Sequence, residues 1–184
     1  GILGVPATYP PEKVRGFMVS GFDTPVTTRI DRTFVFPTAE YERFRNWVFA
    51  DFQESRIGSG WHAEALKKLH DAIRIKTSLC LDCLKREPWD FFMVVFGESD
   101  TVAHHFWAFH DPHSPRYVPD SPWQTAVLSI YQQLDKALGA IMNTIDDGNT
   151  LILVVSDHGF GGAGTGVVHL NNYLAEQGFL RFRK

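Results

Sequence analysis

Short apolar runs alternate along the chain with longer segments in which apolar residues recur at helical spacing. The runs Val14–Phe22, Asp90–Phe96 and Leu151–Val155 are bounded by turn residues and are typical of buried strands. Residues 61–85 and a segment that starts near Ser121 instead carry one apolar helical face each. This order predicts an α/β fold, with a mostly parallel sheet and helices on both of its faces.

Local signals add the remaining expected elements. Ser121-Pro122 offers a capping serine and a proline at the first helical position, and Gly148 ends the helix that follows. Thr38 is placed to cap a helix that carries apolar residues as far as Phe52. The other expected elements are an extended segment at 31–37, a short helix at 171–178 and a strand at 179–182.

Composition indicates a globular chain with a substantial core, because its 184 residues are 44% apolar. The net charge of −3 gives no nucleic-acid-binding signature and no reason to expect an anionic membrane surface as partner. No apolar run approaches the length of a membrane-spanning helix.

The two cysteines, Cys80 and Cys83, form a single C-x-x-C pair. A zinc ribbon needs a second pair, and redox motifs of this spacing begin a helix, whereas this pair lies late in a helical pattern. We therefore predict two reduced, structural thiols.

The run Leu151–Val155 ends in Ser156-Asp157-His158-Gly159. A carboxylate and an imidazole at the carboxyl end of a strand stand where open α/β sheets bind ligands. Asp and His are also natural ligands of a zinc-like ion. Taken alone, such a motif is more often a turn with a helix cap.

A second Asp/His pair, Asp100 and His104, follows the run Asp90–Phe96. If the chain turns helical there, the four-residue spacing puts both side chains on one face. Two such pairs after two strands predict a two-metal centre. In such centres the ions lie roughly 3.5–4 Å apart and stabilise both the attacking and the leaving oxygen of phosphoryl transfer.

Other polar residues near the pairs admit two interpretations each. Glu98 either orients a ligand histidine or faces water, and His105 either supports the ligands or packs. His110 and His113 belong to a Pro-rich loop and are interpreted as solvated. His169 is a candidate ligand, although a structural histidine leading into the last helix is the simpler interpretation.

A nucleophile is harder to find. An activated Ser or Thr is expected at a helix N-terminus beside a metal. Thr8 lies between prolines with no helix after it, and Thr24 and Thr101 are no better placed.

The segments V-V-S-D-H-G-F-G and E-S-D-T-V-A-H-H-F-W resemble the two metal motifs of the type I phosphodiesterase/nucleotide pyrophosphatase family, in the alkaline phosphatase superfamily. The resemblance is closest to the microbial branch and runs along most of the chain. It is also carried by the connecting segments V-P-A-T-Y-P-P-E, G-F-M-V-S-G-F-D-T-P, I-Y-Q-Q-L-D-K-A-L-G and H-L-N-N-Y-L-A-E-Q-G-F-L.

The resemblance implies an alkaline-phosphatase-like fold and a metal-dependent hydrolase of phosphodiester or pyrophosphate bonds in small molecules or nucleotides. It implies two divalent ions, zinc first and manganese second, one held by Asp157 and His158 and the other by Asp100 and His104. The family reaction is a double displacement through a phosphorylated Thr or Ser.

The resemblance also implies that the chain is part of a single catalytic domain, with an insertion or cap at about 27–86. The nucleophile segment and the last ligand have no match, so we expect the chain to lack them and to be inactive alone. Rival interpretations are a sulfatase, phosphonate hydrolase or phosphomutase of the same superfamily, a non-catalytic binding module, and a metal-storing domain. A sulfatase would carry Cys or Ser in C/S-x-P-x-R ahead of these motifs.

Overall fold

The computed structural model describes residues 1–21, 30–49, 58–145 and 147–183. Its sheet has four strands: β1 (Ile2–Val5), β2 (Met18–Ser20), β3 (Val35–Phe36) and β4 (Met93–Val94). Their order in the sheet is β3-β2-β1-β4. The strand β1 pairs in parallel with β2 and β4, whereas β3 runs antiparallel to β2. The predicted α/β class with a mostly parallel sheet is therefore confirmed.

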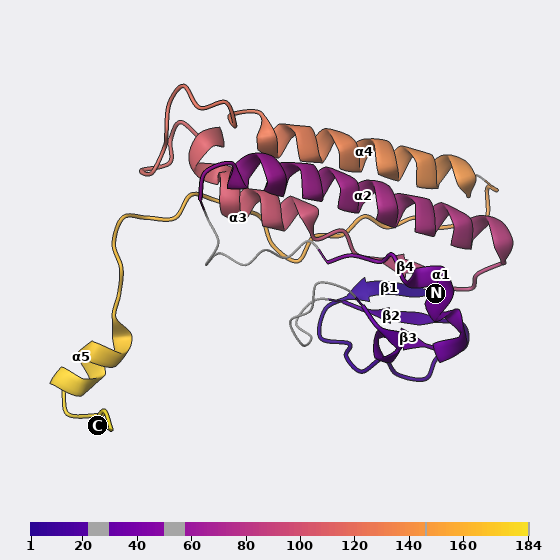
Figure 1. The fold of residues 1–184 in the computed structure, drawn as a ribbon, viewed down its shortest axis with the longest axis horizontal. Helices are drawn as coiled ribbons and strands as arrows, with labels where there is room; N and C mark the ends of the chain where they lie inside the picture. Colours follow the sequence, from indigo (N-terminus) through magenta and orange to yellow (C-terminus); the bar gives the residue numbers. More distant parts are fainter. Residues whose placement is uncertain (22–29, 50–57, 146, 184) are drawn as a thin grey trace.

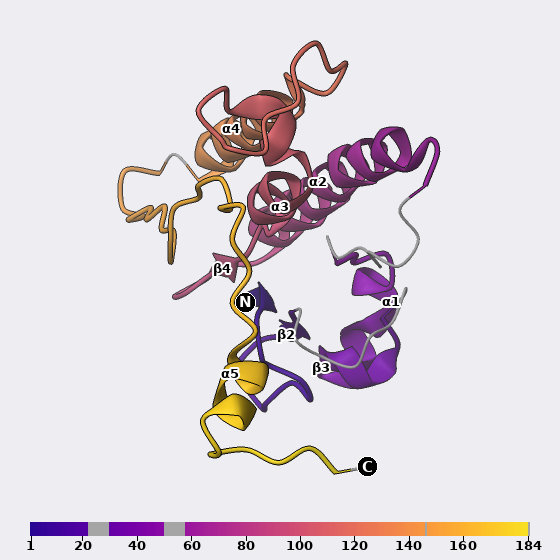
Figure 2. The ribbon, with the colours of Figure 1, turned by 90° about the vertical axis from the view of Figure 1, so that its left-hand side faces the viewer.

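Three long helices form a layer beside the sheet (Figure 1), and Figure 2 shows the same layer from the side. They are α2 (Trp61–Arg86), α3 (Glu98–His110) and α4 (Ala126–Thr144). Two shorter helices are α1 (Tyr41–Phe44), near the sheet, and α5 (Leu170–Glu176), which stands apart from the body of the molecule (Figure 1). No helix in the described ranges is long and apolar enough to cross a bilayer.

Two hydrophobic clusters hold these layers together. The first joins the sheet to α1 and to the C-terminal half of α2, where Cys80 and Cys83 are fully buried against Leu3 and Phe44. The second lies among the three long helices and is centred on residues of their facing sides: Leu69, Ile73, Val102, Phe106, Val127 and Ile130. The second cluster buries the predicted apolar face of α4 from Ala126 to Ala137 and, on α2, the predicted positions Leu69 and Ile73.

The expected helix from Thr38 to Phe52 is much shorter than its pattern suggests. Thr38 starts a 3-10 turn (Thr38–Glu40) instead of capping a helix, and α1 ends at Phe44. The chain then turns, with the Trp47 amide donating to the Phe44 carbonyl at 2.7 Å, so that both rings are buried against the sheet. Phe52 lies outside the described residues.

The helix predicted from Ser121 begins five residues later, at Ala126. The Ser121 hydroxyl accepts from the Trp123 amide at 3.2 Å and caps a turn, in which the Trp123 ring packs onto the helical cluster. The helix ends at Thr144, and Gly148 lies in the following turn with φ of +68°. The sequence signals correctly predicted a helix between Ser121 and Gly148, but the helix begins after the first signal and ends before the second.

The predicted strand at Leu151–Val155 is wrong for the structure described here. The segment has no regular secondary structure and pairs with no strand among the described residues, and Leu151, Leu153, Val154 and Val155 are 74–84% exposed. The strand expected at 179–182 is also absent from the described part of the chain. An apolar run becomes a strand only when a neighbouring strand accepts its backbone hydrogen bonds.

Other predicted elements also differ from those observed. The observed strands are shorter than the predicted ones. Three described residues of the run Val14–Phe22 pair in the sheet, and two residues of the run Asp90–Phe96 do. The segment 31–37 divides into a 3-10 turn (Arg32–Phe34) and β3. The strand β1 had no predicted counterpart, because Gly1–Val5 is short and interrupted by Gly4. The short helix predicted at 171–178 is confirmed as α5.

Candidate metal centre

One face of α3 carries the polar residues of the second motif. Asp100, His104 and Trp107 follow one another at helical spacing, while Val102 and Phe106 on the other side are fully buried. The helix begins at Glu98, directly after Gly97 and shortly after the end of β4 at Val94. The helical turn expected after this strand is therefore present, and it aligns Asp100 with His104.

Asp100 touches both motifs. Its Oδ2 atom lies 3.5 Å from Nε2 of His104, and its Oδ1 atom lies 3.7 Å from Nε2 of His158. His158 Nε2 is also 3.8 Å from Oδ1 of Asp157. The structure thus brings the two Asp/His pairs together, although the segment before Asp157 forms no strand.

Hydrogen bonds within the turn fix the orientation of the His158 ring. Its Nδ1 atom lies 2.8 Å from the Gly159 carbonyl, which can only accept, so Nδ1 carries the proton. In the neutral ring, Nε2 then has the free lone pair, and this atom faces Asp100. The His158 amide donates to Oδ1 of Asp157 at 3.1 Å, and the Ser156 hydroxyl donates to the His158 carbonyl at 2.6 Å.

The electrostatics of the turn favour the protonated form of His158. The hydrogen bond to the Gly159 carbonyl and the nearby charges of Asp157 and Asp100 raise the pKa of the imidazole above its ordinary value. A divalent cation between these groups would replace that proton, because a histidine ligand must be neutral.

The donor set fits a divalent cation in its chemistry. Two carboxylates and two imidazoles are borderline-hard ligands of the kind that zinc and manganese accept. Asp100 Oδ1 is buried and has no hydrogen-bond partner among the described residues, so it has an acceptor position to spare. Within the described ranges, however, no three His, Cys, Asp or Glu side chains converge as ligands of one ion. Each pair therefore supplies only part of a coordination shell.

Glu98 matches neither interpretation drawn from the sequence, in which it orients a ligand histidine or faces water. It does not face water, since it is fully buried, and its Oε1 atom lies 2.7 Å from Nζ of Lys76. Neither carboxylate oxygen accepts a hydrogen bond of good geometry within the described chain, so the contact is an ion pair. Lys76 was missed at the sequence level, although a lysine within the buried stripe Leu69, Ile73 and Cys80 of α2 is an available signal.

The other histidines take peripheral places. His105 packs edge-on against Trp61, with ring centroids 5.0 Å apart, which supports the packing interpretation. His110 and His113 are exposed, as expected for solvated residues. His169 directly precedes α5, which lies well away from α3 (Figure 1), and its carbonyl accepts from the Tyr173 amide. The structure does not bring His169 to the two pairs.

The hydroxyl of Thr8 forms hydrogen bonds with backbone groups. It donates to the Val5 carbonyl at 2.7 Å and accepts from the Gly21 amide at 3.2 Å, which ties the end of β1 to the end of β2. The Thr101 hydroxyl donates to the Gly97 carbonyl, and Thr24 lies outside the described residues. Thr8 is thus a structural residue here.

Cys80 and Cys83 are free and buried, as predicted. Burial raises the pKa of Cys80 to about 12 and that of Cys83 to about 11, so neither is a thiolate at neutral pH.

Comparison with known families decides the class. A sequence profile of the type I phosphodiesterase/nucleotide pyrophosphatase family matches residues 5–184. The chain belongs to this family. The phosphodiesterase/nucleotide pyrophosphatase family consists of hydrolases that are generally metal-dependent and act on small-molecule nucleotide substrates. Neither the curated proteins nor the solved structures contain a match to the chain.

Proposed function

We propose that the protein hydrolyses phosphodiester or pyrophosphate bonds with two divalent metal ions. Asp157 and His158 hold one ion, and Asp100 and His104 hold the other. Zinc is the expected metal and manganese the alternative, because carboxylate and imidazole ligands suit both. The substrate is a small phosphodiester or a nucleotide.

One observation carries the proposal. Asp100 stands within 3.7 Å of an imidazole from each motif, so residues that are more than fifty positions apart in sequence meet at one place. A structural ion pair would need one carboxylate and one cation, whereas here Asp100 contacts two imidazoles and Asp157 contacts one of these, so that two carboxylates and two imidazoles meet. Such a surplus of acceptors is what a bound cation neutralises.

The residues of the chain have distinct tasks in this proposal. The bound metals supply Lewis-acid activation of oxygen and neutralise charge on the phosphate. The buried Oδ1 of Asp100 accepts no hydrogen bond among the described residues and is available as a ligand, and the Gly159 carbonyl holds the Nδ1 proton of His158 so that Nε2 remains a ligand. His158 and Asp157 are more than half exposed, which leaves the site open to substrate.

The test is metal analysis of the full-length protein combined with hydrolysis of a chromogenic phosphodiester. Asp157→Asn should lose metal and activity, whereas Asp135→Asn, an exposed carboxylate on α4, should retain both. Undiminished activity after Asp157→Asn would contradict the assignment of Asp157 as a metal ligand. Bound metal with turnover of sulfate esters or phosphonates in place of diesters would favour the rival chemistries, and absence of metal would favour a binding module.

A second experiment concerns the 184-residue chain by itself. We expect it to bind metal weakly and to turn over little, because we assign four ligands and no nucleophile among the residues that the structure describes. Robust diester hydrolysis by this chain would show that a nucleophile lies within it.

A further inference from the structure

Phe160 is the one half-buried residue of a long exposed segment. From Leu153 to Tyr173 every residue is exposed except Phe160, which is half-buried. Its ring lies on the polar face of α3, with its centroid 5.0 Å from that of His104 and 5.1 Å from that of Trp107. The ring stands perpendicular to His104, at 87°, and tilted by 44° against Trp107.

Trp107 offers Phe160 a fixed surface. The indole Nε1 donates to Oδ2 of Asp111 at 3.3 Å, and the ring packs edge-on against His110 at 5.4 Å. These two contacts restrain the indole ring. His104 and Trp107 are three residues apart in α3, so their rings are neighbours on one helical face.

The chain passes close to the body again just after Phe160. A Cβ atom added to Gly162 would lie 2.6 Å from Oγ of Ser114, a buried residue in the loop after α3. A side chain at position 162 would therefore push the segment away. Gly162 allows the close approach that seats Phe160.

We propose that Phe160 is a positioning residue that holds the Asp157–Gly159 turn against α3 and orients the His104 ring. The polar contacts alone are weak, because His158 is 57% exposed and Asp157 is 90% exposed, and water screens such pairs. The apolar contact of Phe160, two residues after His158, is what keeps His158 Nε2 beside Asp100. The inference rests on the proposed function in so far as the turn carries metal ligands.

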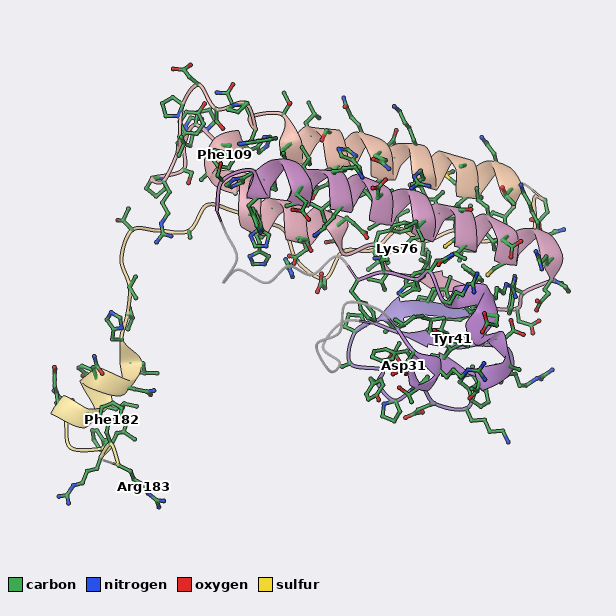
Figure 3. The ribbon with its side chains drawn as sticks, viewed as in Figure 1. Asp31, Tyr41, Lys76, Phe109, Phe182 and Arg183 are labelled. Atoms are coloured by element: carbon green, nitrogen blue, oxygen red, sulfur yellow. The ribbon has the colours of Figure 1, made fainter. Side chains whose placement is uncertain are left out.

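The experiment measures Zn²⁺ affinity and ring proximity separately in the protein. Phe160→Ala should weaken Zn²⁺ binding about tenfold in competition with a chromophoric chelator, because the contact that seats the ligand turn is lost. Phe160→Tyr should restore the affinity. Phe182→Ala is the matched control, since Phe182 is 63% exposed and lies on the segment apart from α3 (Figure 3). It should leave the affinity unchanged.

Ring proximity is read by proton NMR of the metal-free protein with labelled Phe and Trp. The wild type should show a nuclear Overhauser effect between Phe160 and Trp107, and the His104 ring resonances should move in Phe160→Ala. Unchanged Zn²⁺ affinity in Phe160→Ala, or no Overhauser effect in the wild type, would overturn the role of Phe160. A wild type that shows the effect but binds no Zn²⁺ would refute the metal proposal and leave Phe160 as the anchor of the turn.

Discussion

Lys76 Nζ lies 2.7 Å from Glu98 Oε1 in the interior, where the two side chains are 5% and 0% exposed. The same ammonium stands 5.3 Å from the centre of the Trp47 ring, in the cluster that faces the sheet. Figure 3 shows Lys76 on the side of α2 that faces the sheet. The pair therefore joins the middle of α2 to the first residue of α3, two positions before Asp100.

Breaking this ion pair should be costly. Lys76→Met would leave the Glu98 carboxylate buried and unpaired, and we expect it to lower the free energy of unfolding by about 3–5 kcal/mol. Lys76→Met with Glu98→Met removes both charges and should recover most of that loss. Urea denaturation followed by circular dichroism measures both changes.

The control for that experiment is on the same helix. Lys67 also pairs with a carboxylate, Asp71, but its side chain is 77% exposed. Lys67→Met should change the free energy of unfolding by less than about 1 kcal/mol. Equal effects of Lys67→Met and Lys76→Met would contradict the buried character of the Lys76–Glu98 pair.

His62 should make stability depend on pH. Its ring lies among aromatic side chains, and desolvation lowers its pKa below the ordinary value of 6.5. The folded state therefore binds the proton less readily than the unfolded state. Stability should be full above about pH 6.5 and should fall as the pH drops from there toward the lowered pKa. The aromatic neighbours are Trp61, Phe106, Phe109 and Trp123.

Thermal unfolding between pH 5 and pH 8 tests this dependence. His62→Phe should make stability less dependent on pH over that range, because phenylalanine fits the aromatic cluster and does not titrate. His113→Phe, at an exposed position, should leave the curve as in the wild type. The same slope in His62→Phe and in the wild type would assign the pH dependence to other groups.

Thr8 should matter for stability and not for chemistry. Thr8→Val removes the hydroxyl that serves the Val5 carbonyl and the Gly21 amide, and should lower the free energy of unfolding by about 1–3 kcal/mol. Thr8→Ser keeps the hydroxyl and should remain close to the wild type. Diester hydrolysis per folded molecule should be unchanged in both. A loss of turnover in Thr8→Val well beyond the unfolded fraction would make Thr8 the nucleophile.

Local spacing predicted the helical placement of Asp100 and His104 better than it predicted the strands. The four-residue interval between Asp100 and His104 needs only a helix, and a helix satisfies its own backbone, so the motif could be placed from sequence. A strand at residues 151–155 needs a partner strand to satisfy its backbone hydrogen-bonding groups. The local sequence pattern does not indicate whether such a partner is present. Contacts between distant segments, such as Phe160 on Trp107, leave no periodic trace and came only from the structure.

The exposure of the run Leu151–Val155 can itself be tested, because a buried strand and an exposed segment respond differently to charge. Val155 is 84% exposed, so Val155→Lys should change the free energy of unfolding by less than about 0.5 kcal/mol. Val19 in β2 is 0% exposed, and Val19→Lys should cost about 3 kcal/mol or more. Urea denaturation of the two variants makes the comparison. A loss in Val155→Lys as large as that in Val19→Lys would mean that the run is buried in solution, as its apolar pattern predicts, and that Asp157 and His158 follow a strand after all.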